Sequence, residues 1–91
     1  MAHYLIGYDL HDPMSYPGVA ELIERQGGAR VLDSLWVIST ELHPLELRAA
    51  LQPAFGPDDG LALVEIRTGS WWACQNAEPE GLAWLRRAIL A

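Results

Sequence analysis

The first apolar stretch of the chain, residues 3–9, reads His-Tyr-Leu-Ile-Gly-Tyr-Asp. Its aromatic and aliphatic side chains predict a strand, and the polar His11-Asp12-Pro13 that follows predicts a loop. Side chains alternate between the two faces of a strand. One face therefore carries Tyr4, Ile6 and Tyr8, and the other carries His3, Leu5, Gly7 and Asp9.

Three later segments repeat apolar residues every three to four positions, which predicts helices that pack along one side. The segments are residues 17–26, residues 44–52 and a final helix that starts at Pro79. Each begins at a proline, which fits the first turn of a helix because its missing N–H is not needed there. Gly27-Gly28 is expected to end the first helix, and Pro53 the second.

The remaining apolar runs predict further strands. Residues 35–40 and 61–66 have strand composition, and residues 29–32 form a weaker candidate. Segments 29–32 and 35–40 form either a hairpin or one bent strand with a bulge. Residues 71–74, Trp-Trp-Ala-Cys, are apolar but do not favour one type of structure.

The order of these elements predicts an α+β fold: a ferredoxin-like split βαβ sheet with helices on one face, plus a C-terminal helix. The 91 residues form a single domain. One face of the sheet is expected to lack helices and to carry Leu5, Gly7 and Asp9. Because an uncovered apolar face needs a partner, we expect a homodimer through that face.

Composition supports a small globular domain. Hydrophobic residues make up 51% of the chain, yet no run is long enough for a transmembrane helix. The N-terminus lacks the features of a signal peptide, so we expect a cytoplasmic protein with no membrane partner. The only cysteine, Cys74, excludes an intrachain disulfide and is expected to be a small, at least partly buried, hydrophobic residue.

The net charge of −6 disfavours nucleic acid as a partner, because an acidic surface repels phosphate. The best candidates for phosphate contact are Arg25 and Arg30, which flank the Gly27-Gly28 turn; Arg48 and Arg67 are further candidates. They are too few and too scattered to form a basic patch. The four tryptophans Trp36, Trp71, Trp72 and Trp84 are therefore expected to pack in the core or an interface rather than to stack on bases.

The run Tyr4-Leu5-Ile6-Gly7-Tyr8-Asp9-Leu10, then Gly28 and Ser34-Leu35-Trp36, resembles the small core protein of CRISPR spacer acquisition, the Cas-two family. The resemblance covers roughly residues 3–66. Residues 67–91 form a divergent tail, which is more similar to the SinR-like relatives of that superfamily. The resemblance implies a ferredoxin-like fold and a dimer in which Asp9 faces its copy.

In the family, two such aspartates could share a Mg²⁺ that activates water against a phosphodiester, which would make Asp9 a catalytic and metal-binding residue. The alternative, which we favour, is that Asp9 caps the loop over residues 10–16. His11 and Asp12 are expected in a solvated loop, and Ser34 in a hairpin or bulge without the base that a nucleophile needs. His3 and His43 are expected at the surface or in an interface.

Three functions follow from these observations. The first is a dimeric, metal-dependent endonuclease or nucleic-acid-handling protein of the CRISPR adaptation type. The second is a dimeric interaction or regulatory module without catalysis, which requires no cofactor. The third is a small-molecule-binding ferredoxin-like domain that uses the uncovered face or the tryptophan-containing tail, residues 67–91, as its pocket. The acidic surface favours the second.

Overall fold

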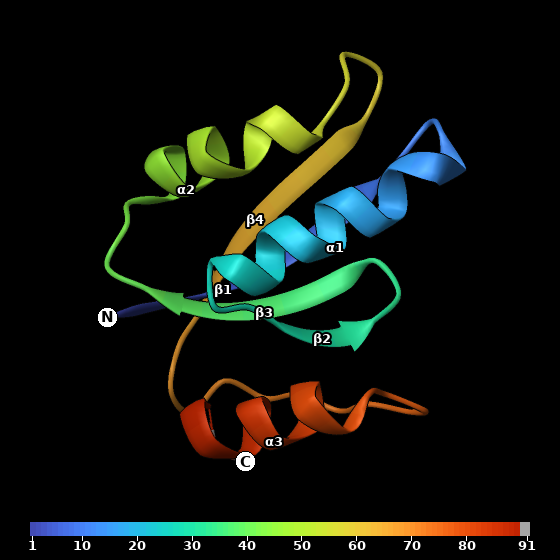
Figure 1. The fold of residues 1–91 in the computed structure, drawn as a ribbon. Helices are drawn as coiled ribbons and strands as arrows, with labels where there is room; N and C mark the ends of the chain where they lie inside the picture. Colours follow the sequence, from blue (N-terminus) through green and yellow to red (C-terminus); the bar gives the residue numbers. More distant parts are fainter. Residues whose placement is uncertain (90–91) are drawn as a thin grey trace.

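The computed structural model describes residues 1–89 and shows one four-stranded sheet with three helices (Figure 1). The strands are β1 (Ala2–Asp9), β2 (Ala29–Leu32), β3 (Leu35–Thr40) and β4 (Gly60–Ile66). The helices are α1 (Tyr16–Arg25), α2 (Pro44–Leu51) and α3 (Pro79–Ala88), and short 3₁₀ turns span Pro13–Ser15 and Gln52–Ala54. Where the sequence predicted both bounds of a strand or helix, they agree to within one residue.

The strand order is β2-β3-β1-β4, and every neighbouring pair is antiparallel. Strand β3 therefore lies between β1 and β2, which splits the first βαβ unit, and β1 lies between β3 and β4. This confirms the ferredoxin-like arrangement. Of the two alternatives for residues 29–40, the hairpin is correct, with a bulge between Arg30 and Leu32.

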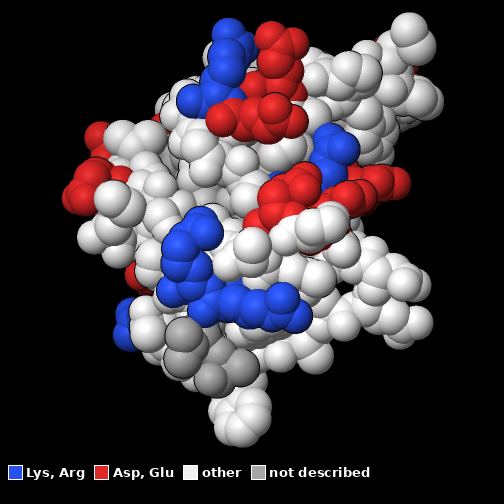
Figure 2. Space-filling view, turned by 60° about the horizontal axis from the view of Figure 1, so that its bottom comes forward, with Lys and Arg blue, Asp and Glu red and all other residues white. Residues whose placement is uncertain are grey.

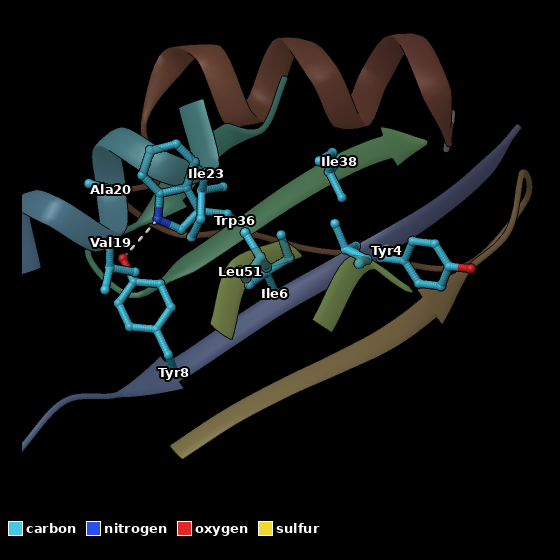
Figure 3. Close-up of a cluster of buried hydrophobic side chains, with 10 residues drawn as sticks. Tyr4, Ile6, Tyr8, Val19, Ala20, Ile23, Trp36, Ile38 and Leu51 are labelled. Carbon is cyan, nitrogen blue, oxygen red and sulfur yellow. Dashed lines mark hydrogen bonds between the residues drawn. The ribbon is translucent and has the colours of Figure 1, made fainter. Parts of the chain in front are cut away.

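Helices α1 and α2 cover one face of the sheet, where the alternation in β1 buries Tyr4, Ile6 and Tyr8. Figure 3 shows these side chains gathered with residues of β3 and of both helices. The other buried members of this core are Val19, Ala20, Ile23, Trp36, Ile38, Leu47 and Leu51. The stripe predicted from the sequence is thus the main core of the domain.

The opposite face is not free of helices, so that prediction is wrong. Helix α3 packs there, and Trp84, Leu85 and Ile89 form a second core with Val31 and Val37. Helix α3 makes most of its contacts with β2 and β3, as Figure 1 also shows, and Trp84 also contacts the ring of His3 on β1, with the ring centres 5.5 Å apart. The apolar stripe of α3 needs a surface to bury it, and the β2–β3 half of the sheet provides one. Leu5 of β1 and Ile66 of β4 also pack against this second core, so the part of the face that remains open is formed by residues 7–9 of β1 and residues 60–64 of β4.

The segment between β4 and α3 corrects two further predictions. Residues 71–74 have no regular secondary structure, and Cys74 is exposed rather than buried. Trp36 and Trp84 are buried and Trp72 packs against the second core, but Trp71 is 100% exposed, so the packing prediction fails for that residue. None of the helices in residues 1–89 has the length and apolarity that a membrane crossing requires.

Candidate functional site

The uncovered part of the second face forms a surface that we call the open strip: Gly7 and Asp9 of β1 with Ala62 and Val64 of β4. The half-buried Leu5 borders this strip, because it packs against the second core. Across the two strands, Leu5 pairs with Val64 and Gly7 with Ala62. Val64 is 54% exposed although it is a β-branched aliphatic residue in a strand. A shallow hollow of about 430 Å³ lies at the Asp9 end of the strip, where Ser34 and Gly60 also line it.

The two edges of the sheet differ. At the β2 edge, the backbone N–H of Glu78, just before α3, donates to the carbonyl of Val31 at 2.9 Å. Gly81 of α3 also lies against the backbone of Arg30 and Val31. In the described part of the chain, strand β4 pairs only with β1, and its sequence, GLALVEI, holds one charged residue and no proline. Natural proteins block exposed edges with charge, proline or a covering segment, and within residues 1–89 β4 has little of this protection.

Asp9 does not cap the loop that follows it, so that interpretation is wrong. Two other carboxylates accept hydrogen bonds from the backbone of this loop. Asp12 accepts from the N–H of Met14 at 2.9 Å, and Asp59 accepts from the N–H of His11 at 2.7 Å. The side chain of Asp9 is exposed and makes no hydrogen bond to another residue within residues 1–89. It therefore reaches solvent at the end of the open strip.

A metal at Asp9 would need ligands from elsewhere. Within residues 1–89, no group of three or more His, Cys, Asp or Glu side chains is placed to hold a cation. Mg²⁺ binds through one or two carboxylates and keeps several waters, so a single chain supplies one ligand at most from this position.

Asp59 has a structural role that the sequence analysis missed, because it ties the loop after β1 to the loop before β4. Its carboxylate accepts from the backbone N–H groups of His11 and Gly56, each at 2.7 Å. These two hydrogen bonds, from His11 and then Gly56, hold the pKa of the Asp59 carboxyl below its usual value of 3.8. The Asp58-Asp59-Gly60 run is typical of a turn, but the sequence does not show which loop it binds.

The two hydrogen bonds of Asp59 predict a pH-dependent contribution to stability. Because the pKa is lower in the folded chain, the unfolded chain takes up the proton first, and the contribution is lost as the pH falls below about 4. We expect Asp59→Ala to lower the denaturation midpoint at pH 7 and to have a smaller effect at pH 3. Asp58→Ala, at the exposed neighbouring position, is the control, and equal shifts for both variants at pH 7 would contradict the assignment.

The structure separates Arg25 and Arg30. Arg25 is exposed at the end of α1, whereas Arg30 is partly buried, with its guanidinium carbon 4.8 Å from the ring centre of Trp36. Figure 2, viewed from the side where α3 lies, shows the arginines in separate groups with acidic side chains beside several of them. That face presents no continuous positive surface for a nucleic-acid backbone.

The remaining polar candidates have structural roles. His43 caps α2 by accepting from the backbone N–H of Leu45 at 3.2 Å, and the Nδ1 atom of His3 lies 2.8 Å from the hydroxyl of Ser39. Ser34 lies in the β2–β3 turn, where its carbonyl accepts from the backbone N–H of Tyr8 at 3.2 Å. His11 is exposed in the loop after β1.

Comparisons with models of known protein families and with curated proteins return no match to this chain.

Proposed function

We propose that this chain is a homodimeric interaction module without catalytic activity, and that two copies join through β4 and the adjoining open strip. The observation that carries the proposal is the difference between the two edges of the sheet. The chain covers the β2 edge with its own α3 segment and leaves β4, which is longer and more apolar, with an open edge. The resemblance to the Cas-two and SinR-like proteins supports a dimer of this fold.

Strand β4 is suited to pair with a copy of itself. In an antiparallel pair centred on Leu63, each Ala62 lies opposite the partner's Val64, so the open strips of the two copies become continuous. Beyond the strand ends, Asp59 lies opposite the partner's Arg67, a pair of opposite charges. A two-fold interface needs a surface that is complementary to itself, and this register provides one.

The same register explains why Asp9 has no catalytic role in this proposal. Asp9 pairs with Gly60 across β1 and β4. In the register centred on Leu63, the partner's Gly60 lies opposite Ile66, which is six residues along β4 from Gly60 of the first copy. At about 3.4 Å per residue, the two Asp9 residues are separated by roughly 20 Å or more. A magnesium ion binds its oxygen ligands at about 2.1 Å, so the two carboxylates cannot share one.

Val64→Lys tests the interface. The substitution puts an ammonium group into the apolar contact, and burying it without a partner is expected to weaken the dimer at least about tenfold. Leu45→Lys is the matched control, because Leu45 is 59% exposed and belongs to α2 on the other face. Sedimentation equilibrium should show a dimer for the wild type and Leu45→Lys, and a shift toward monomer for Val64→Lys. A monomeric wild type, or a dimer unchanged by Val64→Lys, would overturn the proposed interface.

Two further measurements separate this proposal from the metal-dependent nuclease. Cleavage of DNA or RNA by the purified protein with Mg²⁺ or Mn²⁺, abolished in Asp9→Asn, would overturn the absence of catalysis. The second uses Asp9→Cys in a Cys74→Ser background, which leaves one cysteine in each chain. Edge pairing predicts that mild oxidation forms no disulfide-linked dimer, whereas paired Asp9 positions predict rapid cross-linking.

A further inference from the structure

A second hollow lies at the far side of the sheet from β4, between the start of α1 and the β2–β3 turn. It measures about 580 Å³ and is lined by Tyr16, Pro17, Arg30, Asp33 and Ser34. This volume falls in the range of about 300–1,000 Å³ that small-molecule sites occupy. It shares Ser34 with the hollow at the end of the open strip, but no residue of β4 lines it, so a ligand here leaves β4 free to pair.

Among residues 1–89, Arg30 is the only cation that lines this hollow, and it is held in place. It pairs across the strands with Trp36, and its guanidinium stacks over the indole ring at 4.8 Å. The indole is itself fixed, because its N–H donates to the Tyr8 hydroxyl at 3.0 Å and Tyr8 donates to the carbonyl of Asp33 at 3.3 Å. A guanidinium that is already ordered loses little entropy when it binds an anion.

The guanidinium has unused hydrogen-bonding capacity. Its Nε atom is buried without a hydrogen-bond partner, and no carboxylate within residues 1–89 lies at ion-pair distance from Arg30. Leaving a buried donor unpaired is costly, so a ligand oxygen that approaches this edge of the guanidinium supplies a hydrogen bond that the folded chain leaves unmade. The planar fork of arginine matches the two oxygens of a carboxylate or the oxygens of a phosphate.

The surrounding carboxylates decide between these anions. Asp33 lines the same hollow, and Glu24 and Glu80 line an adjoining one on the other side of Arg30. Three carboxylates around one guanidinium disfavour a dianion such as phosphate more than a singly charged carboxylate. Asp33 also offers an acceptor for a cationic group on the same ligand, while Tyr16 and Pro17 provide apolar surface.

We infer that this hollow binds a small amino carboxylate with an apolar side chain. Arg30 holds the carboxylate of the ligand, Asp33 accepts from its ammonium group, and the side chain of the ligand contacts Tyr16 and Pro17. The inference does not depend on the proposed dimer.

Four probes test it by nitrogen-15 NMR: phenylalanine, 3-phenylpropionate (no ammonium), phenethylamine (no carboxylate) and inorganic phosphate. We expect phenylalanine at millimolar concentration to shift the Arg30 Nε–H and Ser34 amide signals. The two truncated probes should bind at least about tenfold more weakly, since each lacks one charged hydrogen bond. No shift with phenylalanine, or tighter binding of phosphate or of either truncated probe, would overturn the inference.

Substitutions assign the binding to the two charged residues. Arg30→Gln should weaken phenylalanine binding at least about tenfold, and Arg30→Lys, which keeps the charge but loses the fork, should weaken it less. Asp33→Asn should reduce the affinity for phenylalanine to that for 3-phenylpropionate. If Arg30→Gln fails to fold, Arg30→Lys and Asp33→Asn carry the test. Arg25→Gln is the matched control, because Arg25 is exposed on α1, and an equal loss in that variant would show non-specific attraction and overturn the inference.

Discussion

Replacing Trp36 with alanine is expected to lower the free energy of unfolding by about 3–5 kcal/mol, the range for large aromatic residues in a well-packed core. Trp36 is 1% exposed and packs in the core between the sheet and helices α1 and α2 (Figure 3). The substitution leaves a cavity and removes the hydrogen bond from the indole to the Tyr8 hydroxyl. Since domains of this size are stable by about 5–15 kcal/mol, a large part of the stability is lost.

Urea denaturation followed by circular dichroism measures this change. Trp71→Ala is the matched control, because it deletes the same side chain at a position that is 100% exposed, and its effect should stay within about 0.5 kcal/mol. Similar losses for the two variants would show that Trp71 is packed in solution, as it would be if a partner covered it. A small loss for Trp36→Ala would contradict the assignment of the main core.

The second large effect is expected at Gly81, the buried glycine in the first turn of α3. A Cβ atom there would meet the carbonyl oxygen of Arg30 and would lie 2.7 Å from the Cα of Val31, which is closer than real contacts allow. These are backbone atoms, so the helix itself must move away from β2. We expect Gly81→Ala to cost about 1–3 kcal/mol, although alanine favours a helix over glycine by about 1 kcal/mol.

Gly18→Ala provides the control for helix propensity. Gly18 belongs to α1, and a Cβ atom there has no neighbour within 4 Å, so the substitution is expected to stabilise the chain by up to about 1 kcal/mol. Opposite signs for the two variants, measured by urea denaturation, would support the close contact of α3 with β2. Stabilisation by Gly81→Ala would mean that α3 does not dock there, and hydrogen exchange in the second core would then be fast.

These two residues also connect the fold to the proposed functions. Trp36 supports the guanidinium of Arg30 and, through Tyr8, the turn that carries Asp33. Gly81 lets α3 approach β2 closely enough to cover that edge of the sheet. The amino-carboxylate site therefore depends on the main core, and the choice of β4 as the open edge depends on the second core.

The sequence alone determined the elements and most of the fold. Alternation in residues 3–9 and the apolar stripes of α1 and α2 reflect local periodicity, and they assign Tyr4, Ile6 and Tyr8 to the main core correctly. The Gly27-Gly28 end of α1 and the prolines at the helix starts are also local signals. Four strands connected by two crossover helices in this order allow few topologies in so short a chain.

Tertiary structure decided where α3 packs, and therefore which surfaces stay open. The stripe of Trp84, Leu85 and Ile89 predicts an amphipathic helix, but periodicity does not say which half of the sheet receives it. A long-range hydrogen bond likewise ties Asp59 to the loop after β1, a contact that Asp9 does not make, and the β2–β3 hairpin places Arg30 but not Arg25 beside Trp36 and Asp33. The packing of α3 and the hydrogen bond of Asp59 join residues that are far apart along the chain, and the contacts of Arg30 depend on the register of the β2–β3 hairpin.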